Sequence, residues 1–167
     1  MSLKKSLLPC LKKIKMLATD VDGVLTDSGM YYSENGDEMK KFNTRDGMGL
    51  VLLRKAGFKV AIVTSEDTKI VERRAAKLKI TDLLQGARDK VAAMEVLMKR
   101  HSLTWDEVAY IGDDVNDLEV LKRVGFAATP SDATVENKKA AQYITKKKGG
   151  EGCVREICDI LLTLRKS

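Results

Sequence analysis

The stretch Ile14-Lys15-Met16-Leu17-Ala18-Thr19-Asp20-Val21-Asp22-Gly23 joins a mostly apolar run to a pair of acids. The run from Ile14 to Thr19 has the length and composition of a buried strand, and Asp20 and Asp22 stand directly at its end. In an open α/β sheet, ligands bind beyond the carboxyl ends of the strands. This stretch therefore predicts a sheet protein with acidic side chains at its binding edge.

The rest of the chain alternates strands and helices in the same way. Further strands are expected at 59–64, 83–84, 108–112, 126–128 and 143–144, and helices at 46–55, 67–79, 90–101, 116–124 and 133–141. A short opening helix, interrupted near Pro9, and an amphipathic closing helix after 149–152 complete the pattern. Helices of about ten residues between strands imply parallel pairing with right-handed crossovers. We therefore expect one doubly wound, mostly parallel α/β domain over residues 1–167.

A β-hairpin is expected to protrude from this sheet. The β-rich pieces Met30–Tyr32 and Glu38–Phe42 flank Glu34-Asn35-Gly36-Asp37, and Asn-Gly between strand formers is a strong hairpin signal. Only 41 residues separate Asp22 from Thr64, which is enough for this hairpin and one helix. The chain therefore has no room for a separate cap domain over the binding edge.

Composition and charge exclude several classes of protein. The hydrophobic share of 44% and the charged share of 32% are ordinary for a soluble globular chain. Five lysines in the first fifteen residues account for most of the net charge of +6 and leave +1 for the rest. The eight aromatic residues do not alternate with basic ones, so we expect no nucleic-acid partner. Every apolar run is far shorter than the ~20 residues of a membrane span.

The cysteines and the N-terminus indicate a cytoplasmic protein. The three cysteines, Cys10, Cys153 and Cys158, are an odd number and lack a zinc-site spacing. Reduced, buried thiols are typical of cytoplasmic proteins. The apolar stretch Leu7–Leu11 is too short for the core of a signal peptide.

Other chemistry-bearing side chains also follow predicted strands or open helices. They are Thr64 after the strand at 59–64, Lys90 at a helix start, and Asp113, Asp114 and Asp117 after the strand at 108–112. Clustered carboxylates repel one another and need a cation to stay ionised. Their hard oxygens select magnesium, whose coordination is usually completed by phosphate.

Such a crevice is suited to the hydrolysis of a phosphomonoester. A metal-held aspartate that faces phosphorus can attack it and form an aspartyl phosphate. A carboxylate two residues on could protonate the leaving alcohol and then deprotonate the hydrolytic water. Thr64 and Lys90 would bind the phosphoryl oxygens and offset their charge in the transition state.

These residues resemble, in order, the four motifs of the haloacid dehalogenase superfamily of phosphatases. The motifs are Asp20-Val21-Asp22-Gly23-Val24-Leu25-Thr26, then Thr64, then Lys90, then Gly112-Asp113-Asp114-Val115-Asn116-Asp117. The resemblance implies that Asp20 is the nucleophile and Asp22 the general acid/base. It also implies a Mg²⁺ ion held by Asp20, the backbone carbonyl of Asp22 and Asp113, with Asp114 and Asp117 in support. Asp117 could instead simply cap its helix.

Two longer segments, 41–49 and 149–156, resemble the small capless branch of this superfamily. Its members remove the terminal phosphate from 3-deoxy-manno-octulosonate (KDO) 8-phosphate or from nonulosonate 9-phosphates, such as those of keto-deoxy-nononate (KDN) and N-acetylneuraminate. The resemblance implies a homotetramer in which the hairpins associate and a neighbour covers each site. It places Thr44, Arg45 and Asp46 on the substrate side, and folds the tail with Arg155 over the crevice, unless Arg155 only belongs to a helix cap.

The sequence leaves the substrate open between these two kinds. Ser65 and Glu66, with Lys77 eleven positions after Glu66, resemble the nonulosonate enzymes of sialic acid biosynthesis. Asp46-Gly47-Met48-Gly49 and Arg155-Glu156-Ile157-Cys158 resemble the octulosonate enzymes of lipopolysaccharide biosynthesis. The pair Glu66 and Lys77 favours a nine-carbon substrate, although Glu66 could be a helix N-terminal charge and Lys77 a solvated side chain.

Two other kinds of protein remain as alternatives. A phospho-accepting receiver domain has a similar size and similar acids, but its phosphorylated aspartate precedes the hydroxyl and lysine on a middle strand. Here Asp113 and Asp114 follow Lys90, where a receiver has no acids. A catalytically idle, tetramer-forming module of the same superfamily is the second alternative, and intact catalytic positions count against it.

Overall fold

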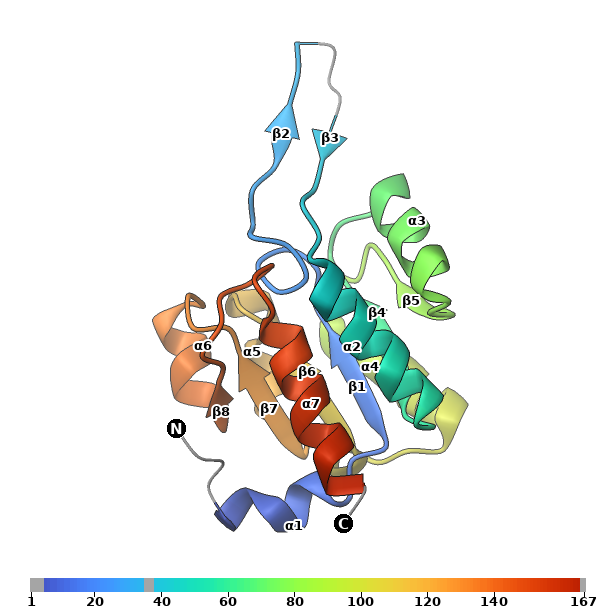
Figure 1. Ribbon diagram of the computed structural model, residues 1–167, viewed down its shortest axis with the longest axis vertical. Coiled ribbons are helices and arrows are strands. Elements are labelled where there is room, and N and C mark those ends of the chain that lie inside the picture. The colour runs from blue at the N-terminus through green and yellow to red at the C-terminus, as the bar shows by residue number, and fades with distance from the viewer. Residues whose placement is uncertain (1–4, 35–37, 166–167) are drawn as a thin grey trace.

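The computed structural model describes residues 5–34 and 38–165, and its centre is a parallel sheet of six strands. The strand order is β5-β4-β1-β6-β7-β8 (Figure 1). The strands are β1 (Met16–Thr19), β4 (Lys59–Val63), β5 (Asp82–Leu84), β6 (Val108–Ile111), β7 (Phe126–Thr129) and β8 (Tyr143–Ile144). Leu17 of β1 pairs with Val60 of β4 and Ala109 of β6. The predicted doubly wound α/β fold is confirmed.

The strands alternate their side chains between two helical layers. In β1, Leu17 belongs to one apolar cluster, whereas Met16 and Ala18 belong to the other. The first layer holds α1 (Leu8–Leu11), α2 (Thr44–Lys55) and α7 (Cys153–Arg165), and the last two pack side by side in Figure 1. The second holds α4 (Lys90–His101) and α5 (Leu118–Leu121). Both faces of the sheet are therefore buried, as a parallel sheet requires.

The helix boundaries differ in places from those that the sequence predicts. α2 begins at Thr44 because the Asn43 side chain accepts a hydrogen bond from the Arg45 amide, which makes Asn43 the N-cap. Pro9 lies in the first turn of α1 rather than interrupting it, since that position needs no amide hydrogen. The helix predicted at 116–124 is divided into a 3₁₀ turn, η3 (Val115–Asp117), and the short α5. The remaining elements are η1 (Lys5–Leu7), α3 (Lys69–Leu78), η2 (Trp105–Glu107) and α6 (Val135–Ala140).

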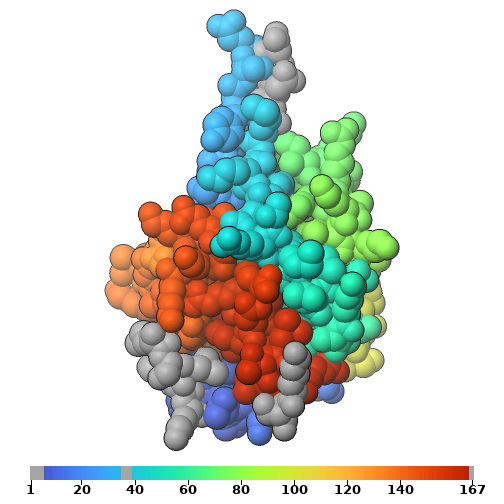
Figure 2. Space-filling view, viewed as in Figure 1, coloured from blue at the N-terminus to red at the C-terminus, as the bar shows by residue number. Residues whose placement is uncertain are grey.

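A hairpin of β2 (Tyr31–Tyr32) and β3 (Glu38–Met39) projects from the body (Figure 2). An antiparallel bridge between Thr26 and Phe42 closes its foot. The predicted Asn35-Gly36 turn lies outside the described residues. Within the described ranges no cap domain is present, and no helix is long and apolar enough to cross a membrane.

The C-terminal helix is anchored to α2 by one buried carboxylate. Asp46 is fully buried, and its oxygens accept hydrogen bonds from the amides of Gly152 (3.1 Å) and Arg155 (2.7 Å). Burial raises the pKa of Asp46, and these amide contacts oppose that rise. Asp46 therefore caps α7 from a neighbouring helix and does not line the binding edge, where the family resemblance places it.

Replacing Asp46 with Ala is expected to destabilise the protein by about 2 kcal/mol, because two buried amides lose their acceptor. At this chain length that loss lowers Tm by about 4–8 °C. Urea and thermal unfolding followed by circular dichroism measure both quantities. Asp159→Ala is the control: it removes an acid that contacts the Arg155 side chain on the surface, and it should cost less than about 0.5 kcal/mol. Equal losses in the two variants would contradict the anchoring role.

Candidate active site

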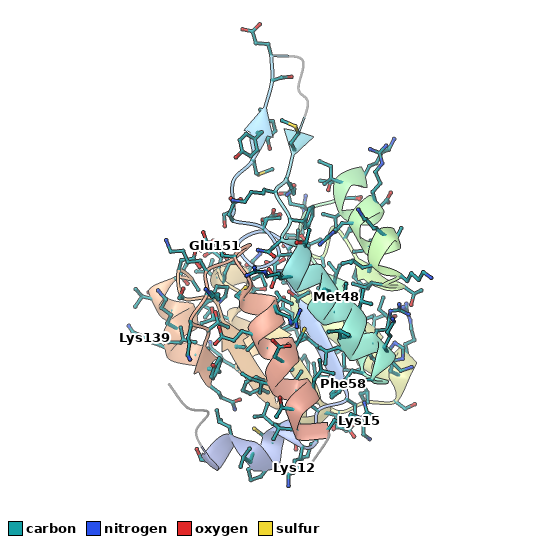
Figure 3. The ribbon with its side chains drawn as sticks, in the orientation of Figure 1. Lys12, Lys15, Met48, Phe58, Lys139 and Glu151 are labelled. Carbon is teal, nitrogen blue, oxygen red and sulfur yellow. The ribbon has the colours of Figure 1, made fainter. Side chains whose placement is uncertain are left out.

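The predicted site residues gather where the strands end, on the side from which the hairpin rises (Figure 1). Asp20 and Asp22 follow β1, Thr64 follows β4, and Asp113 and Asp114 follow β6. Lys12 and Lys15, from the basic N-terminal segment, lie at the opposite end of the molecule (Figure 3). The positive charge near the N-terminus is therefore remote from this edge.

A buried lysine joins two of the acids. Lys90 opens α4, and its Nζ lies 2.7 Å from Oδ2 of Asp20 and 2.6 Å from Oδ1 of Asp117. The side chains of all three residues are less than a tenth exposed. Burial lowers the pKa of Lys90, but the charges of Asp20 and Asp117 outweigh it and hold that pKa above its ordinary value. Lys90 is therefore a protonated cation between two carboxylates.

Asp117 organises the loop that follows β6. Its Oδ1 also accepts the Tyr110 hydroxyl at 2.6 Å, and its Oδ2 accepts the amides of Asp113 (3.0 Å) and Asp114 (3.4 Å). Both oxygens of this fully buried side chain thus have protein partners. The geometry makes Asp117 a positioning group for Lys90 and for the two preceding acids. Asp114 is exposed and caps η3 through the Val115 amide.

The acids form a cluster that fits a divalent cation. Oxygens of Asp20, Asp113 and Asp117 lie within 4.8 Å of one another. Oδ1 of Asp113 is buried and has no hydrogen-bond partner among the described residues. Burial, together with the charges of Asp20 and Asp117, raises the pKa of Asp113 to about 8. Burial also raises the pKa of Asp20. A bound cation would offset this repulsion, and an all-oxygen donor set is what Mg²⁺ prefers.

The turn after β1 needs glycine where the motif places it. Gly23 has φ of +78°, a left-handed conformation, and a Cβ there would overlap the Asp113 carboxylate. The glycine-rich segment before α7 packs against the same turn, and the Gly150 amide donates to the Val24 carbonyl at 2.9 Å. A Cβ at Gly149 would overlap the Gly23 carbonyl. Gly149 and Gly150, although far along the chain, therefore support the turn that carries Asp22.

Asp22 pairs with a lysine that the sequence does not single out. Lys40 follows β3, and its Nζ lies 2.7 and 2.8 Å from the two carboxylate oxygens of Asp22. The Asp22 side chain is 28% exposed, so it is more open to solvent than Asp20. The lysine is eighteen residues from Asp22, and only the return of the hairpin brings the two together. No local motif or spacing marks such a contact.

Thr64 and Ser65 follow β4, the strand that pairs with β1. Thr64 is buried at the end of β4, and its hydroxyl accepts the Glu66 amide at 3.3 Å. The Ser65 hydroxyl accepts from the Asn116 side chain at 3.3 Å, which links the β4 and β6 loops. Glu66 is exposed beside this contact.

The other predicted substrate contacts are spread more widely. Thr44 and Arg45 are exposed and line a hollow of about 330 Å³. Lys77 is exposed in the last turn of α3, whereas Glu66 is exposed before the start of that helix. The Arg155 side chain contacts Asp159 at 2.8 Å, and its amide joins the α7 cap.

Comparison with known proteins identifies the family. A model of haloacid dehalogenase-like hydrolases matches residues 63–157. The 3-deoxy-D-manno-octulosonate 8-phosphate phosphatase of Escherichia coli K12 is 42% identical over 151 residues, which cover 90% of this chain and 80% of the relative.

Solved structures give the same result. The octulosonate phosphatase of Moraxella catarrhalis, in complex with magnesium, phosphate and KDO, has a TM-score of 0.95 at 36% identity and covers 98% of this chain and 94% of its own. The cobalt-bound enzyme of Haemophilus influenzae has a TM-score of 0.91 at 38% identity, with coverage of 94% and 92%. This chain belongs to the haloacid dehalogenase-like hydrolases, and within them it is a phosphatase.

Proposed function

We propose that this protein hydrolyses 3-deoxy-D-manno-octulosonate 8-phosphate with the help of Mg²⁺. The observation that carries the chemistry is the cluster of Asp20, Asp113 and Asp117 around the buried ammonium of Lys90. Two relatives support this substrate: the Escherichia coli K12 enzyme at 42% identity is a phosphatase of this eight-carbon compound, and the Moraxella catarrhalis enzyme at 36% identity is crystallised with KDO. They do not support the nine-carbon substrate that Glu66 and Lys77 favour in the sequence.

The proposed reaction passes through a phosphorylated Asp20. The Asp20 carboxylate attacks phosphorus, and the bond between phosphorus and the sugar oxygen breaks. Asp22 enters this step as the protonated acid and gives its proton to the departing sugar oxygen; as a carboxylate it then takes a proton from the water that hydrolyses the aspartyl phosphate, which releases phosphate and regenerates Asp20. Lys90 and Thr64 stabilise the phosphoryl oxygens.

The proposed metal ligands are Asp20, the backbone carbonyl of Asp22, and Asp113. Mg²⁺, when bound, adds positive charge where phosphoryl charge develops. The buried Oδ1 of Asp113 supports this assignment. Asp117 acts through its contacts to Lys90 and the Asp113 amide, and Asp114 acts from the rim of the site.

We also propose a homotetramer held by the hairpins. Met30, Tyr31, Tyr32 and Met39 are large apolar side chains that the hairpin exposes. Such a patch on a projecting element is typical of an interface. In this assembly a neighbour covers each uncapped crevice, and Lys77 reaches a substrate bound to another chain. The likeness to a capless branch of the family supports the proposal.

The substrate is tested by phosphate release in the presence of Mg²⁺. Octulosonate 8-phosphate should have a kcat/KM at least about tenfold above those of nonulosonate 9-phosphates. Asp20→Asn should lower the rate by at least about 10⁴-fold while the circular dichroism spectrum is retained, because the nucleophile is lost. Preference for the nonulosonate 9-phosphates would support Glu66 and Lys77 as residues that select a nine-carbon substrate. Phosphatase activity in Asp20→Asn would contradict the mechanism.

Metal removal should abolish activity and also lower stability. Excess EDTA is expected to reduce phosphate release by more than about 100-fold, and added Mg²⁺ should restore it. Binding at 100 times Kd stabilises the folded state by about 2.7 kcal/mol, so Mg²⁺ should raise Tm by about 5–10 °C. Asp113→Asn should remove most of this rise. Full activity in EDTA, or the same rise in the variant, would contradict the carboxylate metal site.

Light scattering should give about four times the 18.5 kDa chain mass. The double substitution Tyr31→Lys and Tyr32→Lys places charges in the apolar patch and should lower that mass. Val96→Lys is the matched control, because Val96 is similarly exposed but lies on α4, away from the hairpin. A monomeric wild-type protein would refute the shared-cover proposal.

A further inference from the structure

Lys40, directly after strand β3 of the hairpin, places a buried ammonium group against Asp22, the proposed general acid/base. Lys40 contacts Oδ1 of Asp22 at 2.7 Å and Oδ2 at 2.8 Å, and its side chain is fully buried. A cation on both oxygens fixes the rotation of the carboxylate about its Cβ–Cγ bond. Charge-assisted hydrogen bonds of this length are among the stronger ones in proteins.

Among the described residues, the Thr26 hydroxyl also contacts the Asp22 carboxylate, but more weakly. The Thr26 hydroxyl lies 3.4 Å from Oδ1 of Asp22, at the long end of hydrogen-bond range. That hydroxyl also has the Val21 carbonyl and the Gly23 amide at 3.4 Å. Thr26 therefore places the turn, and Lys40 places the carboxylate within it.

Asp20 and Asp22 thus form ion pairs with different lysines, which come from different elements. Lys90 comes from α4 and pairs with Asp20, whereas Lys40 comes from the hairpin and pairs with Asp22. Lys90 is shared between two acids, and its place follows from the core helix that carries it. The placement of Lys40 depends instead on an element that projects from the body.

We propose that Lys40 is a positioning residue for the phosphatase reaction, which acts through Asp22. It holds the Asp22 carboxyl group where a proton can pass to the sugar oxygen as its bond to phosphorus breaks. This inference rests on the acid/base role of Asp22 in the proposed function. It also makes the orientation of Asp22 depend on how the foot of the hairpin is held.

Leaving-group chemistry provides the test. A sugar alkoxide needs a proton as it leaves, whereas p-nitrophenolate, a weak base, needs little help. The ratio kcat/KM covers the steps up to formation of the aspartyl phosphate. Lys40→Met should therefore lower kcat/KM by about 100-fold for octulosonate 8-phosphate, and by less than about fivefold for p-nitrophenyl phosphate. Lys40→Arg, which keeps a cation able to donate hydrogen bonds to both oxygens of Asp22, should recover most of the loss.

Two comparisons separate positioning from folding. Lys41→Met removes the same charge one residue later, from a side chain that pairs with Asp27 on the surface, and it should keep the wild-type ratio between the two substrates. In an Asp22→Asn background, Lys40→Met should cause no further loss of kcat/KM on octulosonate 8-phosphate, because its effect passes through Asp22.

Each result decides the question. Equal losses on both substrates would show a structural role and overturn the inference, and so would a Lys40→Met enzyme with wild-type rates. A further loss in the Asp22→Asn background would show that Lys40 acts elsewhere. If the wild-type protein releases phosphate from neither substrate, the proposed function fails, and the assignment of Lys40 fails with it.

Discussion

The ammonium group of Lys90, buried between Asp20 and Asp117, is the interaction on which the site depends. Removing one member of such a buried set typically costs about 3–5 kcal/mol, because the remaining charges stay buried without compensation. The set joins segments that are distant in sequence: Asp20 follows β1, Lys90 opens α4, and Asp117 ends η3. The carboxyl edge of the sheet is thereby fixed as one unit before any ligand arrives.

The group of Asp20, Lys90 and Asp117 leaves an excess of negative charge that a cationic ligand can neutralise. Lys90 neutralises part of the charge, yet Asp113 lies close to the same acids, and its buried Oδ1 has no hydrogen-bond partner among the described residues. The raised pKa values of Asp20 and Asp113 express the cost of holding these carboxylates together. A divalent cation lowers that cost, and a phosphate group completes the coordination of the cation. The strain in the cluster is therefore the physical reason for expecting a metal there.

The sequence predicts the parts of this molecule that repeat or stay local. Strand ends and helix starts place Asp20, Thr64, Lys90 and Asp113 at one edge, because parallel strands share their carboxyl ends. It fails where a contact depends on tertiary geometry. Lys40 reaches Asp22 only through the return of the hairpin, and Asp46 is fully buried as a cap for α7 although its neighbours Thr44 and Arg45 are exposed. Arg155 likewise contributes to the cap through its amide, with its side chain turned toward Asp159.

The two acids of the Asp20-Val21-Asp22 motif differ in environment more than in chemistry. Asp20 is almost fully buried and held by Lys90, which suits a nucleophile that must present a fixed oxygen to phosphorus. Asp22 is partly open to solvent and held by Lys40, which suits a group that exchanges protons with an alcohol and with water. Environments that differ in this way are how one site assigns separate roles to identical side chains. Since the environment of Asp22 is built partly by the hairpin, the element proposed to join the subunits also shapes the acid/base.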